Sequence, residues 1–169
     1  MTDPPGPVGF DPIGWIRTPF TDIEGMPIQA SAAVGIEGSI ELRPDLEAGL
    51  ADVGGFSHLV LLYHLDRASA PRLSVTPFLD DHPRGIFATR SPARPNPIGL
   101  STVRLLGIEG ATLRIADVDM LDRTPLLDIK PYVPAFDDRA EPRIGWYAHR
   151  LERLPATRSD HRFGPDRHV

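Results

Sequence analysis

The central part of the chain begins with Arg84-Gly-Ile-Phe-Ala-Thr-Arg90-Ser-Pro-Ala-Arg94-Pro-Asn96-Pro-Ile-Gly-Leu100-Ser and ends with Asp117-Val-Asp119-Met-Leu-Asp122-Arg-Thr-Pro-Leu-Leu-Asp128-Ile-Lys130-Pro-Tyr132. The first segment is rich in arginine and the second in aspartate. Apolar residues 98–106 and 112–118 lie between them, separated by a turn at 107–110. Two such runs around a glycine-containing turn predict a β-hairpin. The hairpin would bring both charged segments to one end, where they could bind a zwitterionic or cationic ligand.

Prolines at positions 92, 95 and 97 stiffen the arginine-rich segment, because a residue before proline is restricted to extended conformations. Fixed arginines bind carboxylate or phosphate groups well, since the guanidinium group is planar and always charged. We therefore interpret this loop as a binding site. The alternative is a rigid surface loop whose arginines pair with nearby aspartates. In the acidic segment, Asp122 fits an Asx-turn as well as a chemical role.

The remainder of the chain predicts short strands. They are expected at residues 10–17, 36–42, 57–65, 85–89, 126–129 and 144–151, beside the hairpin, with a short helix at 44–51. Residues 57–65 form a continuous apolar run, which predicts a strand buried on both faces. The pattern lacks βαβ alternation and therefore predicts an all-β fold, a small closed β-barrel of about seven short strands with one or two short helices. We expect a barrel domain at 10–155, between a flexible tail at 1–9 and a polar tail at 156–169.

The composition narrows the class of protein. The chain has 169 residues, 41% of them hydrophobic, with 19 prolines, no cysteine and a formal net charge of −5. Without cysteine there is no disulfide, thiolate metal ligand or cysteine nucleophile. The histidines form no ligand cluster, so we expect no metal, and we find no phosphate-binding or dinucleotide motif. Neither a signal peptide nor a membrane-spanning run is present, so we expect a cytoplasmic protein.

Three motifs resemble one known family. Phe87-Ala-Thr-Arg90-Ser-Pro-x-Arg94-Pro-Asn-Pro-Ile-Gly-Leu-Ser, Asp119-x-x-Asp122-x-Thr-Pro-x-x-Asp128-Ile-Lys-Pro-Tyr and Gly55-Phe-Ser-His58 are similar to signatures of the TsaA-like, or TrmO (YaeB), family. The resemblance covers residues 13–132. It implies a small β-barrel, usually dimeric, that binds S-adenosylmethionine without a Rossmann fold. It also implies methylation of N6 of N6-threonylcarbamoyladenosine next to the tRNA anticodon.

The sequence departs from the family pattern in three places. The first loop has Ile28-Gln-Ala-Ser31 where the family often has Arg-Gln-Pro-Gly, and Arg123 replaces the glycine of a common Asp-Gly-Thr-Pro motif. The chain also looks like a short form without the C-terminal domain of longer members. These departures bear on the tRNA substrate more than on the cofactor.

The resemblance implies roles for individual residues. A cofactor pocket is expected at Gln29, Ala30, Ser31, Ala32, Asp66, Arg67, Arg90, Leu100, Asp117, Val118 and Asp119. There, Arg90 would bind the methionyl carboxylate, acids the ammonium group, and Leu100 the adenine or thioether. Our candidates for a catalytic base are Asp128 and Tyr132. Substrate contacts are expected from Arg84, Arg94, Asn96 and Lys130.

Three functions fit these expectations. The first is a tRNA methyltransferase dependent on S-adenosylmethionine, acting as a homodimer. The second is a methyltransferase that uses the same cofactor on a small molecule. The third is a non-catalytic module that binds S-adenosylmethionine. The acidic balance of the chain weighs mildly against a nucleic-acid partner.

Overall fold

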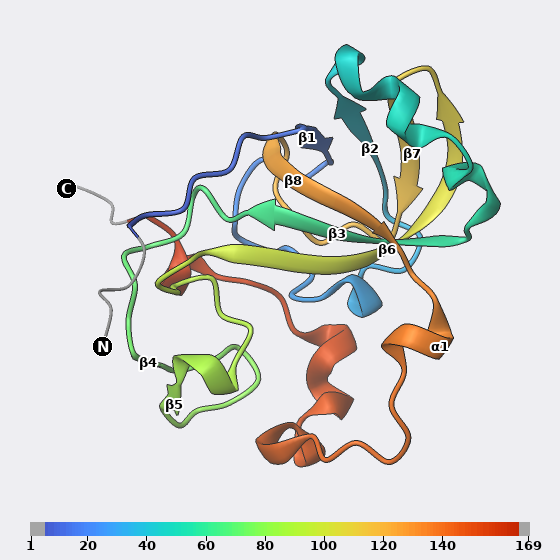
Figure 1. Cartoon of the computed structure of the whole chain (residues 1–169). Coiled ribbons are helices and arrows are strands. Elements are labelled where there is room, and N and C mark those ends of the chain that lie inside the picture. The colour runs from blue at the N-terminus through green and yellow to red at the C-terminus, as the bar shows by residue number, and fades with distance from the viewer. Residues whose placement is uncertain (1–5, 166–169) are drawn as a thin grey trace.

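The computed structural model describes residues 6–165, and six of the strands in this part close into an antiparallel barrel in the order β1-β2-β7-β6-β3-β8 (Figure 1). A separate two-stranded sheet, β4–β5, lies beside it. The strands are β1 Gly14–Arg17, β2 Glu37–Leu42, β3 His58–His64, β4 Ser74–Val75, β5 Arg84–Gly85, β6 Ile98–Glu109, β7 Thr112–Ala116 and β8 Thr124–Pro131. The predicted closed all-β barrel is confirmed, with six strands in the barrel rather than about seven.

The helices of the described residues are short. One α-helix, α1 Pro134–Asp137, follows the barrel. The 3₁₀ helices are Ala30–Ala32, Pro44–Leu50, Val53–Gly55, Ile86–Ala88, Gly145–His149, Leu151–Ala156 and His161–Phe163. The helix predicted at 44–51 therefore exists as a 3₁₀ helix, with Pro44 in its first turn and acidic residues after it. None of the helices within residues 6–165 combines the length and the apolar character that a membrane crossing requires.

Alternating side chains explain how the barrel strands pack. In β3, Leu59, Leu61 and Tyr63 are buried while their neighbours are more exposed. The strand is therefore buried on one face, and the prediction of burial on both faces was wrong. Tyr63 of β3 lies opposite Gly99 of β6. At this end of β3 the buried side chains change from leucine to the polar-tipped tyrosine. That end of the barrel opens into the main cavity.

The predicted hairpin is confirmed as β6–β7, with β6 reaching Glu109 and a tighter turn than expected. Gly110 occupies this turn with φ +55°, a conformation that favours glycine. As a result, the arginine-rich loop before β6 and the aspartate-rich loop after β7 meet at the same end of the barrel.

Two predicted strands were wrong. Residues 85–89 contribute only Gly85 to β5 and then form a 3₁₀ turn at Ile86–Ala88. Residues 144–151 form 3₁₀ helices, which begin after Gly145 turns the chain with φ +58°. The strand predicted at 10–17 is confined to Gly14–Arg17. These segments carry apolar residues without a stable alternation, so their pattern alone did not specify a strand.

The two segments expected as tails differ in how they pack against the rest of the molecule. Residues 6–9 are exposed, and positions 1–5 lie outside the described residues. The expected polar tail packs onto the molecule over residues 156–165: Phe163 is buried in a second apolar cluster with Val75, Ile86 and Ala93. Figure 1 shows the orange-red C-terminal segment and the green β4–β5 pair on the same side of the barrel.

Candidate functional site

A cavity of about 830 Å³ opens where the two charged loops meet. Its wall comes from six parts of the chain. These are the loop 23–31, the end of β3 with the loop after it, residues 77–79 between β4 and β5, the arginine-rich loop with the start of β6, the loop after β7 with the start of β8, and the C-terminal segment 144–164. Most of the wall lies at the ends of strands, where loops carry side chains on a rigid scaffold. A cavity of this size lies towards the upper end of the range of about 300–1,000 Å³ that is typical of ligand pockets.

Arg90 brings positive charge to the wall of the cavity. Its Nη1 donates a hydrogen bond to Oε1 of Gln29 at 3.1 Å, joining the arginine-rich loop to loop 23–31. Arg94 has a different role in the same loop, although it also reaches the wall. Its Nη1 donates to the carbonyl oxygens of Ile86 and Thr89 at 3.2 and 2.8 Å. Arg94 therefore fixes the loop that presents Arg90.

A hydrogen-bonded chain of three side chains runs through the floor of the cavity. The hydroxyl groups of Tyr63 and Ser101 lie 2.8 Å apart, and Ser101 donates to Oδ1 of Asp119 at 2.6 Å. The ring of Tyr63 lies directly over Gly99, where an added Cβ atom would approach within 2.0 Å of the ring. Gly99 thus allows Tyr63 to reach Ser101, and Ser101 in turn fixes the carboxylate of Asp119.

The carboxyl group of Asp119 is electrostatically unusual. Burial raises its pKa to about 6, although Ser101, the backbone N–H of Ala30 and the Arg90 charge act in the opposite direction. Burial also raises the pKa of Tyr63, which therefore remains neutral. A carboxyl group that faces a cavity and is only partly neutralised by protein groups can accept a cationic ligand. The site thus offers a carboxylate and a guanidinium group within one cavity.

The C-terminal segment closes another part of the wall. The rings of Trp146 and Tyr147 stack with centroids 3.8 Å apart and an interplanar angle of 26°. Leu151, Leu154 and Phe163 add apolar surface. None of these residues was predicted from the sequence as part of the site. Tyr63, Gly99 and Ser101 were not predicted either, although the polar end of an otherwise apolar strand pair was a usable signal.

The structure brings many of the predicted site residues to this cavity. Those that line it are Gln29, Ser31, Asp66, Arg67, Arg90, Arg94, Leu100 and Asp119. Arg67 also donates to the backbone carbonyl of Asp122 and so supports the acidic loop. Oδ1 of Asp122 accepts from Arg17 at 2.9 Å and from the Thr18 backbone N–H at 3.1 Å, which ties this loop to the end of β1.

Other predicted cofactor residues lie just outside the wall. Val118 is completely buried in the barrel core. Asp117 turns away with φ +71° and bonds to the Gly35 N–H at 2.7 Å and to Arg104. Ala30 and Ala32 form a 3₁₀ turn behind the wall, where Ala30 supplies a backbone donor to Asp119. Arg123, at the position of the usual glycine, adopts φ +65° with its side chain exposed.

The predicted catalytic and substrate residues are mostly elsewhere. Asp128 pairs with Lys130 at 2.7 Å on β8, and Tyr132 donates to Asp138 at 2.7 Å beyond the strand. Tyr132 packs near His58, at the end of β3 opposite to the cavity. Arg84 forms an ion pair with Asp80 at 2.6 Å. The exposed Asn96 also lies outside the wall. The roles of these residues stay predictions.

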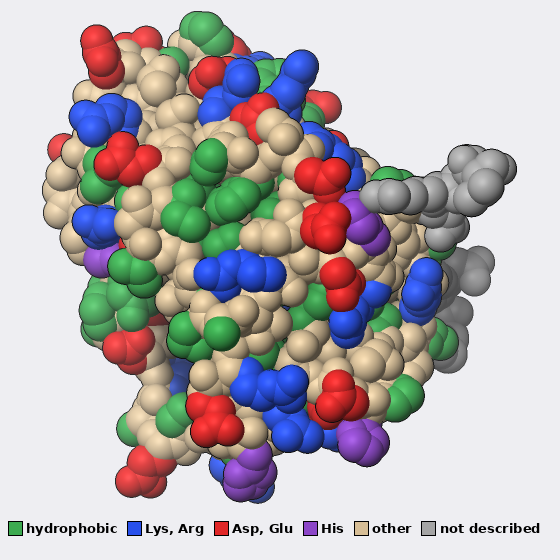
Figure 2. Space-filling model, turned by 180° about the vertical axis from the view of Figure 1, so that it is seen from behind, with side chains coloured by type: hydrophobic (Ala, Val, Ile, Leu, Met, Phe, Trp, Pro, Cys, Tyr) green, Lys and Arg blue, Asp and Glu red, His purple; other side chains and the backbone are tan. Residues whose placement is uncertain are grey.

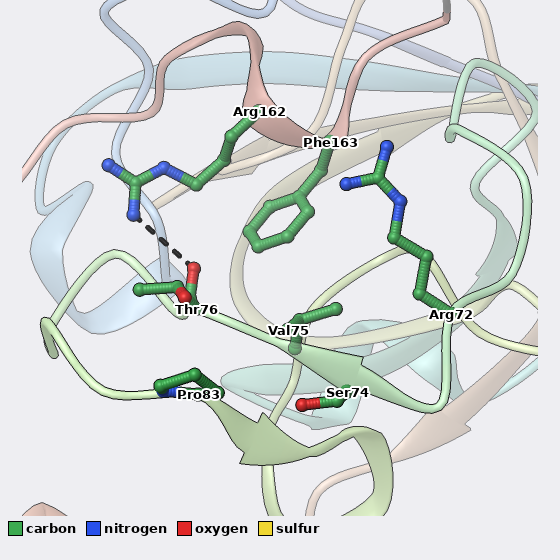
Figure 3. A pocket seen from close by; sticks show the side chains of 7 residues that line it. All are labelled: Arg72, Ser74, Val75, Thr76, Pro83, Arg162 and Phe163. Carbon is green, nitrogen blue, oxygen red and sulfur yellow. Dashed lines mark hydrogen bonds between the residues drawn. The ribbon is translucent and has the colours of Figure 1, made fainter.

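A second, smaller cavity of about 310 Å³ lies beside β4 (Figure 3). Arg72 and Arg162 extend on either side of the Phe163 ring there. Arg162 is already neutralised by Asp160 at 2.7 Å, and it donates to the Thr76 carbonyl at 3.3 Å. One of its two arginines is therefore already paired with a carboxylate. Among residues 6–165 no cluster of three or more acidic or histidine side chains could hold a metal ion.

The chain belongs to the TrmO family. The sequence model of that family, described as the tRNA-methyltransferase O N-terminal domain, matches residues 15–138. This range includes the barrel strands except Gly14, the first residue of β1, together with both charged loops, and ends before the C-terminal segment of the cavity wall.

Three similar proteins illustrate the family. A "probable S-adenosyl-L-methionine-binding protein" of Pyrococcus abyssi is 53% identical over 154 residues, covering 91% of this chain and 84% of that protein. A tRNA (adenine(37)-N6)-methyltransferase of Mus musculus is 34% identical over 137 residues, covering 75% of this chain and 31% of the mouse protein. The crystal structure of TrmO from Pseudomonas aeruginosa superposes with a TM-score of 0.72 at 36% identity, covering 86% of this chain and 63% of that chain.

Proposed function

We propose that this protein is an S-adenosylmethionine-dependent methyltransferase that methylates N6 of threonylcarbamoyladenosine next to the tRNA anticodon. The observation that carries the proposal is the pair of Arg90 and Asp119 in one large cavity of a TrmO-family barrel. The names of the Pyrococcus and mouse relatives support the cofactor and the reaction, respectively.

The groups in the cavity fit the methionyl part of the cofactor. That part carries a carboxylate and an ammonium group, and the cavity offers a guanidinium from Arg90 and a carboxylate from Asp119. Arg90 exchanges its present partner, Gln29, for a stronger, charged acceptor. The ionised Asp119 accepts from the ammonium group while Ser101 retains its hydrogen bond. Leu65 and Leu100 provide apolar surface for the adenosyl part.

Bound S-adenosylmethionine supplies an electrophilic methyl group, so that a bond from the acceptor nitrogen to carbon forms as the sulfur–carbon bond breaks, and the nitrogen loses its proton to water. The protein mainly orients the reactants, an effect that contributes about 7–11 kcal/mol in well-aligned intramolecular reactions. The Tyr63–Ser101–Asp119 chain provides a fixed point for that alignment. This proposal does not require a catalytic role for Asp128 or Tyr132.

Nucleoside mass spectrometry tests the reaction. The purified protein is incubated with S-adenosylmethionine and tRNA that contains unmethylated N6-threonylcarbamoyladenosine. We expect one methyl group to appear on this nucleoside, and Arg90→Ala to reduce its formation by at least about tenfold, because a charge-assisted contact is lost. A protein that binds the cofactor but leaves the nucleoside unmethylated would contradict the proposed acceptor.

One observation favours a small-molecule acceptor as the second candidate. The net charge is −5. On the face drawn in Figure 2, basic side chains are dispersed among acidic ones and do not form one continuous basic patch. A small acceptor needs no phosphate-binding surface. Methylation of a metabolite extract by the protein, with no methylation of tRNA, would favour this candidate.

We further infer a homodimer in the cytoplasm. Ile98 and Leu100 at the rim of the cavity are 43% and 51% exposed, which supports an apolar contact between two copies near the site. Light scattering of the purified protein checks the dimer. Fractionation of cells that express the protein checks the location.

A further inference from the structure

We propose that the C-terminal segment 144–164 forms the acceptor side of the cavity, and that a planar nucleobase of the acceptor stacks on Tyr147. This inference rests on the proposed methyltransferase function and adds to it the residue that recognises the acceptor. It concerns a part of the chain beyond residues 15–138, the range that the family model matches.

The cavity has two chemically different sides. The charged groups, Arg90 and Asp119, come from loops inside the family match. The C-terminal segment instead contributes mostly apolar and aromatic side chains, including Tyr147, Leu151 and Leu154. The volume of about 830 Å³ is near the upper end for one drug-sized ligand. After the cofactor has occupied the charged side, space remains next to the aromatic side.

The aromatic side is held rigidly. Trp146 donates from Nε1 to the Ala88 carbonyl at 2.8 Å, and its ring stacks on Tyr147. The guanidinium carbon of Arg84 lies 5.4 Å from the centre of the Trp146 ring. Burial raises the pKa of the Tyr147 hydroxyl, while the backbone N–H and the charge of Arg90 act on it in the opposite direction. Tyr147 is therefore fixed beside the residue that we assign to the cofactor.

A buried ion-pair cluster anchors the same segment. Asp80, whose side chain is fully buried, accepts from Arg84 at 2.6 Å and from Arg150 at 3.4 Å. Arg150 lies only three positions after Tyr147, so this contact fixes the segment against the β5 region. A flat, rigid aromatic surface at the edge of a charged cavity suits a nucleobase, because bases stack on aromatic side chains.

Binding of an RNA hairpin tests the proposal. The full chain is saturated with S-adenosylhomocysteine, and its affinity is measured for an anticodon stem-loop containing N6-threonylcarbamoyladenosine and for the same stem-loop abasic at that position. We expect the wild-type protein to bind the intact loop about tenfold more tightly, since stacking of one base contributes a factor of this size. Tyr147→Leu should remove the difference, and Tyr147→Phe should restore it.

The controls distinguish a failure of the Tyr147 inference from a failure of the proposed methyltransferase function. Arg143→Ala changes an exposed residue immediately before this segment and outside the cavity wall, and should retain the wild-type difference. All variants should bind S-adenosylhomocysteine within about twofold of wild type. If Tyr147→Leu methylates and binds like an active wild type, the inference is wrong but the proposed function stands. If Tyr147→Leu instead loses S-adenosylhomocysteine, the segment belongs to the cofactor side. A wild type that never binds the cofactor contradicts the proposed function itself.

Discussion

The charge of the Asp119 side chain depends on pH in a range that is accessible to experiment. Its pKa is raised to about 6 by burial, so the carboxyl group is ionised above this pH and neutral below it. If the ionised form accepts the ammonium group of the cofactor, affinity for S-adenosylmethionine should fall about tenfold from about pH 7 to about pH 5. Titration calorimetry across this range measures the change.

Two variants make this pH test specific. Asp119→Asn cannot ionise, so its affinity should be low and nearly constant with pH. Asp52→Asn removes an exposed carboxyl outside the cavity wall and should retain the wild-type profile. A wild-type affinity that stays constant down to about pH 5 would show that the ionised Asp119 does not bind the ammonium group.

Gly99 is the residue on which the position of Tyr63 depends. Any Cβ atom there would lie 2.0 Å from the Tyr63 ring, so Gly99→Ala must displace the ring and break its contact with Ser101. Overpacking of this kind costs about 1–3 kcal/mol in unfolding free energy. Denaturant unfolding measures this cost. Weaker cofactor binding should accompany it, because Ser101 loses its contact with the Tyr63 hydroxyl and then positions the Asp119 carboxylate less firmly.

Gly107 provides the matched comparison in the same strand. No atom lies within 4 Å of a Cβ added at Gly107. Gly107→Ala should therefore change the free energy of unfolding by less than about 0.5 kcal/mol and leave cofactor affinity unaltered. Equal effects from the two substitutions would mean that the Tyr63 contact contributes nothing specific.

The charge pattern and the predicted hairpin were enough to place the arginine-rich and aspartate-rich loops at one end of the barrel, whereas Arg90 and Asp119 within these loops were singled out by the family resemblance. The same information did not separate the roles of the arginines. Arg94 donates to the Thr89 carbonyl and Arg84 pairs with Asp80. Both partners lie within five positions of the arginine, but the turns that bring them into contact do not follow from the residue types alone. The residue type predicts an anion or acceptor partner, whereas the fold decides which one is within reach.

At the scale of elements, the attachment of the C-terminal segment should depend on Asp80. Arg84 is the main cause of the lowered pKa of this buried carboxyl, so Asp80 stabilises the folded state above its ordinary pKa of 3.8. Asp80→Asn should leave two arginines without their charged partner and lower Tm at neutral pH by about 5–10 °C. Thermal unfolding followed by circular dichroism measures this loss.

The pH dependence of that effect has a definite sign. Because the pKa of Asp80 is lower in the folded chain than in the unfolded chain, its contribution is present above pH 3.8 and declines as pH falls below it. The difference in Tm between wild type and Asp80→Asn should therefore narrow under acid conditions. Asp81→Asn, at the exposed neighbouring position, should have almost no effect at either pH. A difference that is independent of pH would argue against the ion pairs.

The elements that sequence predicted best are those whose packing is encoded locally. Residues 36–42 alternate apolar and polar side chains, and the hairpin consists of two apolar runs around a glycine-containing turn; all three segments form barrel strands. The C-terminal segment was predicted wrongly because its burial comes from partners far away in the sequence, such as Ala88 for Trp146. Because this segment has no alternation of apolar and polar residues, its position depends on the distant residues that it contacts at the cavity.

For the whole molecule, the net charge affects the binding of tRNA more than the binding of a small acceptor. An acidic chain with a charge of −5 can bind tRNA only through local arginines, and each phosphate that they neutralise adds about 0.7–0.9 to the slope of log affinity against log salt concentration. With about three to four such contacts, tRNA affinity should fall about 20- to 150-fold from about 50 to about 200 mM salt. Filter binding or anisotropy measures this slope.

The affinity for S-adenosylmethionine should change much less over the same range, since in the proposed site Arg90 and Asp119 would bind it inside a cavity, where salt screens charges less than at the surface. Comparing the two ligands thus separates a surface that attracts RNA from a cavity that binds the cofactor. If tRNA binding were as insensitive to salt as cofactor binding, the phosphate backbone would contribute little. The small-molecule acceptor would then be the better explanation, because its recognition would depend only on the cavity and its C-terminal wall.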